Sequence, residues 1–235
     1  MRLINVCSLE MKEFYDSNTP PYIILSHRWQ EDEITYQDFE INQGRQKGSY
    51  HKIEHLCQIA REKEIDWVWL DTCCIDKRNL TELSEAINSM YRRYQQSQLC
   101  VAYLSDVEDG YDQLNSSTWF IRCWTLLELI APSELQFYDR TWKYIGQKSD
   151  MCQQLSEITK IDEATLAGAD PRRCSIAQRM SWAAGRHATR MEDEAYSLLG
   201  LFDISMPMLY GDGKRAFISL QERIVQTSDD QSIFA

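Results

Sequence analysis

Positive charge is in short supply in this sequence of 235 residues. Lys and Arg number 25 against 36 Asp and Glu, so the formal net charge is -11 and the pI is near 4.9. A nucleic-acid-binding protein neutralises phosphates with clustered Lys and Arg, and an anionic membrane surface attracts the same residues. The composition therefore argues against nucleic acid and membrane as partners.

Long apolar runs and targeting signals are also missing. No run approaches the roughly 20 residues of a membrane-spanning helix, and the amino-terminal segment Met1–Lys12 lacks the apolar region of a secretion signal. The 43% hydrophobic and 11% aromatic content is typical of a packed globular protein. We therefore expect a globular domain located in the cytoplasm.

Metal-binding spacings are absent although the chain has eight cysteines. No two cysteines form a C-x-x-C pair, and without a secretion signal we expect free thiols rather than disulfides. Among the four histidines only His51 and His55 have a spacing that could suggest ligands. We interpret this pair as a solvated helix face, and we predict neither a metal site nor a permanently bound cofactor.

Short apolar runs alternate with helical patterns in the first part of the chain. Four runs predict strands, the last of them with the alternation of an edge strand: 22–26, 67–71, 99–104 and 134–138. Apolar residues at helical spacing between 53 and 60 and between 83 and 94 predict the intervening helices. This order predicts an α/β fold with a parallel sheet that is covered by helices on both faces.

Polar residues follow three of the predicted strands, where the carboxyl ends of a parallel sheet bind ligands. They are Ser26, His27, Arg28 and Trp29 after the first strand, the segment Asp71–Asp76 after the second, and Ser105 and Asp106 after the third. We therefore expect a site at this end of the sheet.

Helical patterns dominate after about Trp142, at roughly 149–158, 175–184, 190–200 and 214–226. Thr189 and Glu192 fit a capping box at the start of the third of these helices. The segment Gly211–Lys214 lacks the full spacing of a phosphate loop, so it predicts a turn that opens the last helix. The chain thus divides into an α/β core at about 20–145 and a helical extension at about 146–235.

Three sequence blocks together resemble the fungal heterokaryon-incompatibility (HET) domain. They are Tyr22–Trp29, Trp69–Asp76 followed by Glu85 and Met90–Tyr91, and Trp119–Glu128; the later segments 190–202 and 210–217 also look like that family. The resemblance runs from about residue 20 to the end, so residues 1–235 are identified as one HET domain. Such domains trigger cell death after non-self recognition and are commonly fused to nucleotide-binding or repeat domains, which this chain would carry beyond its carboxyl terminus.

The HET domain is in turn similar to the TIR domain, a flavodoxin-like fold in which several members cleave NAD at the nicotinamide–ribose bond. The resemblance implies a flavodoxin-like (TIR-like) parallel sheet flanked by helices, with a C-terminal helical extension. TIR enzymes carry a catalytic Glu, often in a Trp-Cys-x-x-Glu pattern. Here Trp124 and Glu128 keep that spacing, with Thr125 in place of Cys. The resemblance therefore makes Glu128 the catalytic candidate and NAD the candidate substrate.

On a helix Trp124 and Glu128 share a face, while Cys123, Leu126 and Ile130 lie on the opposite side, which we expect to face the core. Glu128 would stabilise an oxocarbenium-like ribose by its charge, because neutral nicotinamide leaves without a general acid. Trp124 would stack on a flat ring. The residues assigned to substrate binding are Ser26, His27, Arg28, Trp29, Asp71, Cys74, Asp76, Arg122 and Trp124, with Arg28 or Arg122 on the pyrophosphate.

Several of these residues also have a structural interpretation. Without the family resemblance, Glu128 would be a solvated helix residue and Trp124 a half-buried packing residue. Ser26 and His27 could terminate a strand, and Asp71, Cys74 and Asp76 could shape a tight loop. Arg122 could pair with a nearby acid. We expect Ser26, Asp71 and Glu128 to converge at one end of the sheet if the site interpretation is right.

Two functions follow from these alternatives. In the first, the domain is an NAD-cleaving enzyme that self-association activates. In the second, it is a non-enzymatic interaction module that recruits a downstream death effector.

Overall fold

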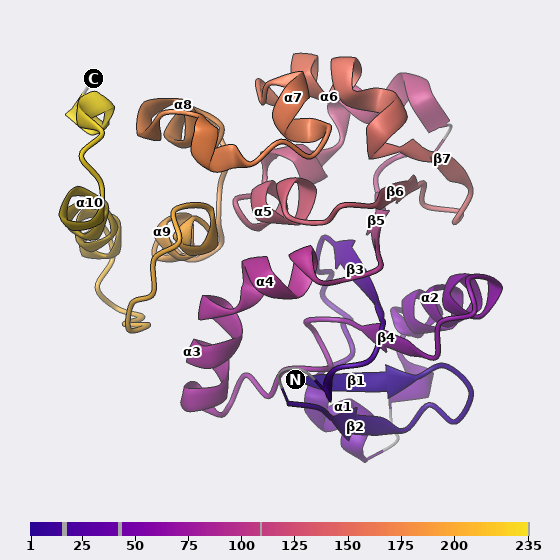
Figure 1. The fold of residues 1–235 in the computed structure, drawn as a ribbon. Helices are drawn as coiled ribbons and strands as arrows, with labels where there is room; N and C mark the ends of the chain where they lie inside the picture. Colours follow the sequence, from indigo (N-terminus) through magenta and orange to yellow (C-terminus); the bar gives the residue numbers. More distant parts are fainter. Residues whose placement is uncertain (16–17, 42–43, 109, 235) are drawn as a thin grey trace.

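The computed structural model describes residues 1–15, 18–41, 44–108 and 110–234 (Figure 1). In this part of the chain seven strands form one sheet in the order β2-β1-β4-β3-β5-β6-β7. The strands are β1 (Arg2–Asn5), β2 (Met11–Glu13), β3 (Ile23–His27), β4 (Trp67–Trp69), β5 (Leu99–Tyr103), β6 (Leu135–Tyr138) and β7 (Tyr144–Gln147).

The four strands predicted from apolar runs form the parallel centre of the sheet. β3 pairs in parallel with β4 on one side and with β5 on the other, and β5 pairs in parallel with β6. Numbered along the chain, these four lie in the order 2-1-3-4, which is how a flavodoxin-like doubly wound sheet begins. All side chains of β3 and β5 are buried. The predicted α/β class is confirmed, and the strand order reverses between β3 and β5.

The outer strands are antiparallel, so the sheet is mixed rather than purely parallel. β1 pairs antiparallel with β4 and with β2, and β7 pairs antiparallel with β6. The predicted edge position of 134–138 is therefore wrong, and so is the expectation that strands end near Trp142. β2 and β7 are too short and too exposed to leave an apolar run in the sequence.

Helices cover both faces of the sheet. The α-helices are α1 (Tyr36–Glu40), α2 (Tyr50–Glu62), α3 (Leu80–Asn88), α4 (Met90–Gln95), α5 (Trp124–Ile130), α6 (Cys152–Thr159), α7 (Glu163–Leu166), α8 (Ile176–Ser181), α9 (Asp193–Tyr196) and α10 (Arg215–Thr227). Short 3₁₀ turns lie at Gly44–Gln46, Gly110–Ser116, Thr118–Ile121, Lys148–Met151, Pro171–Arg173, Leu199–Leu201 and Gln231–Phe234. α2 packs against β3 and β4, whereas α4 and α5 lie on the opposite side of β3 (Figure 1). The single helix predicted over 83–94 is divided into α3 and α4 at Ser89.

The extension is largely helical, as predicted, and α9 and α10 pack together at the side of the molecule away from β1 and β2 (Figure 1). The predicted capping box is wrong, because α9 begins at Asp193 without a side-chain cap. The Glu192 carboxylate instead accepts hydrogen bonds from the amides of Gly211 and Gly213, at 2.7 and 3.0 Å. Both glycines have positive φ, which a side chain would disfavour. Glu192 thereby fixes the predicted turn before α10.

No helix in the described ranges combines the length and the apolar character that crossing a membrane would require.

Candidate functional site

Glu128, Ser26 and Trp119 form a hydrogen-bonded relay where the strand order reverses. Ser26 lies near the carboxyl end of β3, Glu128 on α5, and Trp119 in the turn Thr118–Ile121. The Ser26 hydroxyl donates to Glu128 Oε2, and the Trp119 indole N–H donates to Ser26 Oγ over 2.8 Å. Exposed fractions are 0% for Ser26, 1% for Trp119 and 9% for Glu128. The carboxyl group is thus held in the protein interior.

This position corrects one expectation about α5. Glu128 was predicted to face away from the core, but every residue from Thr125 to Ile130 is buried. The helix lies between β3 on one side and α4 and α7 on others, so it has little solvent-facing surface. Thr125, which stands where the TIR pattern has Cys, donates through its hydroxyl to the carbonyls of Trp119 and Arg122. Thr125 therefore fixes the turn that delivers Trp119 to Ser26.

The pKa of Glu128 is raised to about 8, and burial is the largest cause; the Ser26 hydrogen bond lowers it, the nearby Asp71 carboxylate raises it, and the Arg122 charge lowers it. Desolvation is the largest of these causes, and it raises the pKa because it penalises the charged form of an acid. Glu128 is therefore largely protonated at neutral pH and can exchange a proton near it, as acid–base groups in active sites do.

Asp71 lies close enough to this relay to act on the pKa of Glu128, and Lys77 connects Asp71 to Trp29. The Lys77 ammonium is 3.9 Å from Asp71 Oδ2 and 3.2 Å from the centre of the Trp29 ring. Burial lowers the pKa of Lys77. Trp29 is 44% exposed, and the Lys77 ammonium covers one face of its ring.

His27 belongs to a second buried cluster, together with Glu33 and Lys52. His27 Nε2 lies 3.5 Å from Glu33 Oε2, and the Lys52 ammonium pairs with the other Glu33 oxygen. Burial opposes the charge of Glu33, but its contacts with His27 and Lys52 prevail and lower its pKa to about 2. Lys52 is only 1% exposed. This arrangement satisfies a buried cation with a carboxylate, as interior charges require.

The two arginines predicted to hold a pyrophosphate lie at the margin of the site. Arg28 is exposed and donates to the Thr118 hydroxyl over 3.2 Å, and Thr118 in turn bonds Asp106 through its amide at 2.7 Å. Arg122 is half-buried, and its charge lowers the pKa of Glu128. Both guanidinium groups thus lie close to the relay or to residues beside it.

Cys74, Asp76 and Trp124 have structural contacts. The buried Cys74 sulfur accepts from the Leu70 amide, and Asp76 accepts from Gln37 Nε2 at 2.7 Å and from the Arg78 amide at 3.0 Å. These contacts agree with the loop-shaping interpretation. Trp124 is half-buried, and its indole lies close enough to Asp193 in the extension to lower the pKa of that carboxyl group. All eight cysteines are free thiols.

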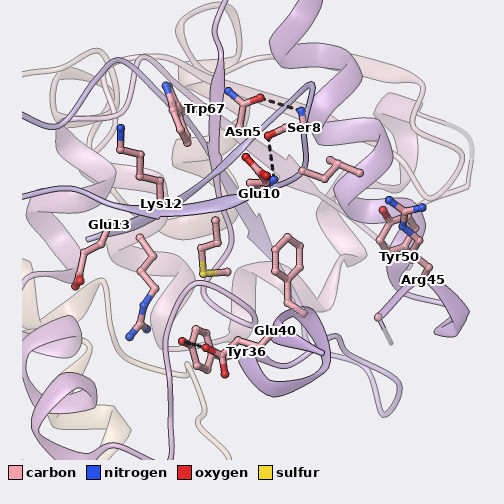
Figure 2. A pocket seen from close by; sticks show the side chains of 15 residues that line it. Asn5, Ser8, Glu10, Lys12, Glu13, Tyr36, Glu40, Arg45, Tyr50 and Trp67 are labelled. Atoms are coloured by element: carbon pink, nitrogen blue, oxygen red, sulfur yellow. Dashed lines mark hydrogen bonds between the residues drawn. The ribbon is translucent and has the colours of Figure 1, made fainter. Parts of the chain in front are cut away.

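Two cavities lie away from the relay. The larger, of about 920 Å³, is open between the β1–β2 hairpin, α1 and the start of α2. Figure 2 shows charged side chains of both signs around it, among them Lys12, Glu13, Glu40 and Arg45. A second cavity of about 450 Å³ adjoins Tyr50 and His55. Neither is lined by a predicted site residue. Glu128 itself is only 9% exposed, so its carboxyl group is closed off from solvent in this conformation.

Sequence reasoning missed four contributors to the site: Trp119, Glu33, Lys52 and Lys77. Trp119 belongs to the third sequence block, but no role was assigned to it. Lys52 could have been found, because it lies four residues before Leu56 and so on the buried face of its helix. Glu33 and Lys77 lie in loops and leave no periodic signal.

These features define a class: a doubly wound α/β protein with a buried carboxyl group of raised pKa at the position where such sheets bind ligands. Residues 22–116 match the family model described as Heterokaryon incompatibility protein (HET). Over 226 residues, 91% of its length, the chain is 39% identical to "Vegetative incompatibility protein HET-E-1" of Podospora anserina. The chain belongs to the heterokaryon-incompatibility (HET) domain family, which confirms the resemblance seen in the sequence. It spans 17% of the length of that relative, and no solved structure matches it.

Proposed function

We propose that this HET domain is a cell-death effector of fungal non-self recognition that cleaves NAD at the nicotinamide–ribose bond after self-association. The observation that carries the proposal is the buried Glu128 carboxyl group beside Ser26 at the switch point of the sheet. The incompatibility role is supported by the family and by the name of the relative.

In the proposed reaction the bond between ribose C1′ and the pyridinium nitrogen breaks, and its electron pair goes to the nitrogen. Neutral nicotinamide leaves, and water adds to C1′ with release of a proton. Ionised Glu128 would stabilise the positive charge that develops on the ribose, an interaction that is strong in a dry site. A cationic substrate nearby would itself favour ionisation of Glu128, because an opposite charge lowers the pKa of a carboxyl group.

Trp29 is a better ring platform in this proposal than Trp124, because Trp29 is 44% exposed whereas Trp124 is half-buried beside Asp193 of the extension. A flat pyridinium cation would have the same electrostatic preference for the Trp29 face as the Lys77 ammonium that lies there, and it would displace that ammonium. Arg28 and Arg122 would contact the pyrophosphate. NAD is a substrate here, and no permanently bound cofactor is part of the proposal.

The test is release of nicotinamide from NAD by the concentrated domain, measured by chromatography. Glu128→Gln should reduce the rate on the order of a hundredfold or more. Glu134→Gln, which removes the same charge from an exposed position one turn beyond α5, should leave the rate unchanged. Equal rates for wild type and Glu128→Gln would refute the assignment.

A scaffold function is the second candidate, because the Glu128 carboxyl is already hydrogen-bonded and only 9% of the residue is exposed. In that case the domain would recruit a death effector through its surface. Self-association and cell killing without nicotinamide release, and equally with Glu128→Gln, would favour this candidate over the enzyme.

A further inference from the structure

We propose that Trp29 and Asp71 form a subsite for an organic cation, and that Lys77 occupies this subsite as a competitor built into the chain. The inference deepens the proposed function and rests on it for the identity of the substrate ring. It depends on how the subsite is assembled, on how loosely Lys77 is held and on which cations can replace it.

Two neighbouring parallel strands deliver the subsite. Trp29 lies two residues beyond the end of β3, and Asp71 lies two residues beyond the end of β4. Because β3 and β4 pair in parallel, both residues leave the sheet at its carboxyl edge. The loop between β4 and α3 brings the Lys77 ammonium to 3.2 Å from the centre of the Trp29 ring and 3.9 Å from Asp71 Oδ2. One cation thus contacts an aromatic face and a carboxylate together.

Lys77 is held loosely in this position. A separation of 3.9 Å from Asp71 is too long for a hydrogen bond, and 31% of the Lys77 side chain is exposed. Lys52 differs, because it pairs closely with Glu33 and is only 1% exposed. The Lys77 side chain can therefore move into solvent without disturbing the elements around it.

Asp71 would lose its partner if Lys77 left. Within the described ranges the ion pair with Lys77 is the only one that Asp71 forms. The other acid that acts on Lys77 is Glu33, which is already paired with Lys52 and His27. The vacated subsite would present a free carboxylate beside an aromatic face, and both attract a cation.

The chemistry of the subsite favours a flat cation of delocalised charge. An ammonium group is compact and strongly hydrated, so it loses more hydration on an indole face than a pyridinium ion does. The oxidised nicotinamide ring is such a pyridinium, whereas the reduced ring is neutral. The subsite would therefore select NAD over its reduced form. The apparent affinity would be the intrinsic one multiplied by the fraction of chains in which Lys77 has left the subsite.

The experiment is a titration of the nitrogen-15-labelled full chain with 1-methylnicotinamide chloride. It follows the indole N–H resonance of Trp29, which Trp29→Phe assigns. Lys77→Ala should bind this cation roughly tenfold more tightly than wild type, because a tethered competitor acts at high effective concentration. Lys77→Gln, which keeps most of the stem and removes the charge, should also gain affinity. Circular dichroism verifies that each variant is folded.

The matched control is Lys63→Ala, which removes an exposed positive charge just after α2 and should bind the cation as wild type does. Asp71→Asn in the Lys77→Ala background should remove the gain. Neutral nicotinamide separates charge from space, because its affinity should be equal in wild type and Lys77→Ala.

Equal affinity of wild type and Lys77→Ala for 1-methylnicotinamide, or an equal gain for neutral nicotinamide, would overturn the inference. These measurements involve no cleavage of NAD. A domain that gains affinity for the cation in Lys77→Ala but releases no nicotinamide would therefore refute the proposed reaction and leave the subsite established. A domain that cleaves NAD without this gain would do the reverse.

Discussion

The carboxyl group of Glu128 is an acid that folding makes weaker. Its pKa is about 8 in the folded chain against an ordinary value of 4.5. Between pH 4.5 and about pH 8, the folded state therefore keeps a proton on Glu128 that the unfolded state has released. The stability associated with this proton is fully present below pH 4.5 and is lost as the pH rises through about 8.

Replacing Glu128 with Gln, which resembles the protonated acid, should remove this dependence. The unfolding free energy of wild type should fall relative to the variant by up to about 1.4 kcal/mol for each pH unit in this window. Chemical denaturation at several pH values measures the difference. A difference that stays constant from pH 5 to pH 8 would contradict the assigned ionisation.

Ser26 should tune the same acid. Its hydrogen bond lowers the pKa of Glu128, so Ser26→Ala should move the titration of that carboxyl to higher pH. The carbon-13 shift of the Glu128 carboxyl follows the titration. Ser97→Ala is the control, because Ser97 is also buried but donates to the Tyr94 carbonyl. An unchanged midpoint in Ser26→Ala would show that the hydroxyl does not act on Glu128.

At the scale of elements, the turn Leu199–Leu201 packs directly against α4. A Cβ added to Gly200 would lie 2.0 Å from the Cβ of Tyr91. This approach requires a residue without a side chain, since neither backbone can move without disturbing the helices around it. The contact joins the extension to the α/β core.

Gly200→Ala should destabilise the protein by about 1–3 kcal/mol or more through this overlap. The melting temperature and the denaturation midpoint measure the effect. In a Tyr91→Gly background the opposing atom is absent, so the same substitution should cost less, and the double-mutant cycle should show coupling. If the destabilisation by Gly200→Ala were the same with and without Tyr91, the overlap with Tyr91 would not be its cause.

The central elements could be predicted from the sequence because β3 and β5 are apolar throughout and leave an unbroken run. β2 and β7 could not, since none of their residues is buried and only pairing with a neighbour makes them strands. Ser26 and Glu128 were found through strand ends and the family blocks. The burial of Glu128 could not be predicted. Helical spacing shows that Glu128 and Trp124 share a face of the helix, but it does not show which neighbouring elements cover that face.

At the scale of the whole molecule, the proposed activity should depend on assembly. The Glu128 relay is closed in the single chain, so association would have to open or complete it. Nicotinamide release should then rise more than linearly with protein concentration. Rates measured across a dilution series, with light scattering to follow size, test this expectation. A strictly linear rate would remove self-association from the mechanism.

α5, the helix that carries Glu128, is held at both ends by cations from the extension. Arg186 donates to the Arg122 carbonyl at 3.1 Å and to the Thr125 hydroxyl at 3.2 Å. The Lys148 ammonium reaches the carbonyls of Leu129 and Pro132 beyond the other end. A genetic crossover near residue 146 would therefore combine α5 from one parent with Arg186 and Lys148 from the other. Hybrids between diverged alleles should accumulate in cells where the parent of the second half keeps Arg186 and Lys148, and poorly where it lacks either cation.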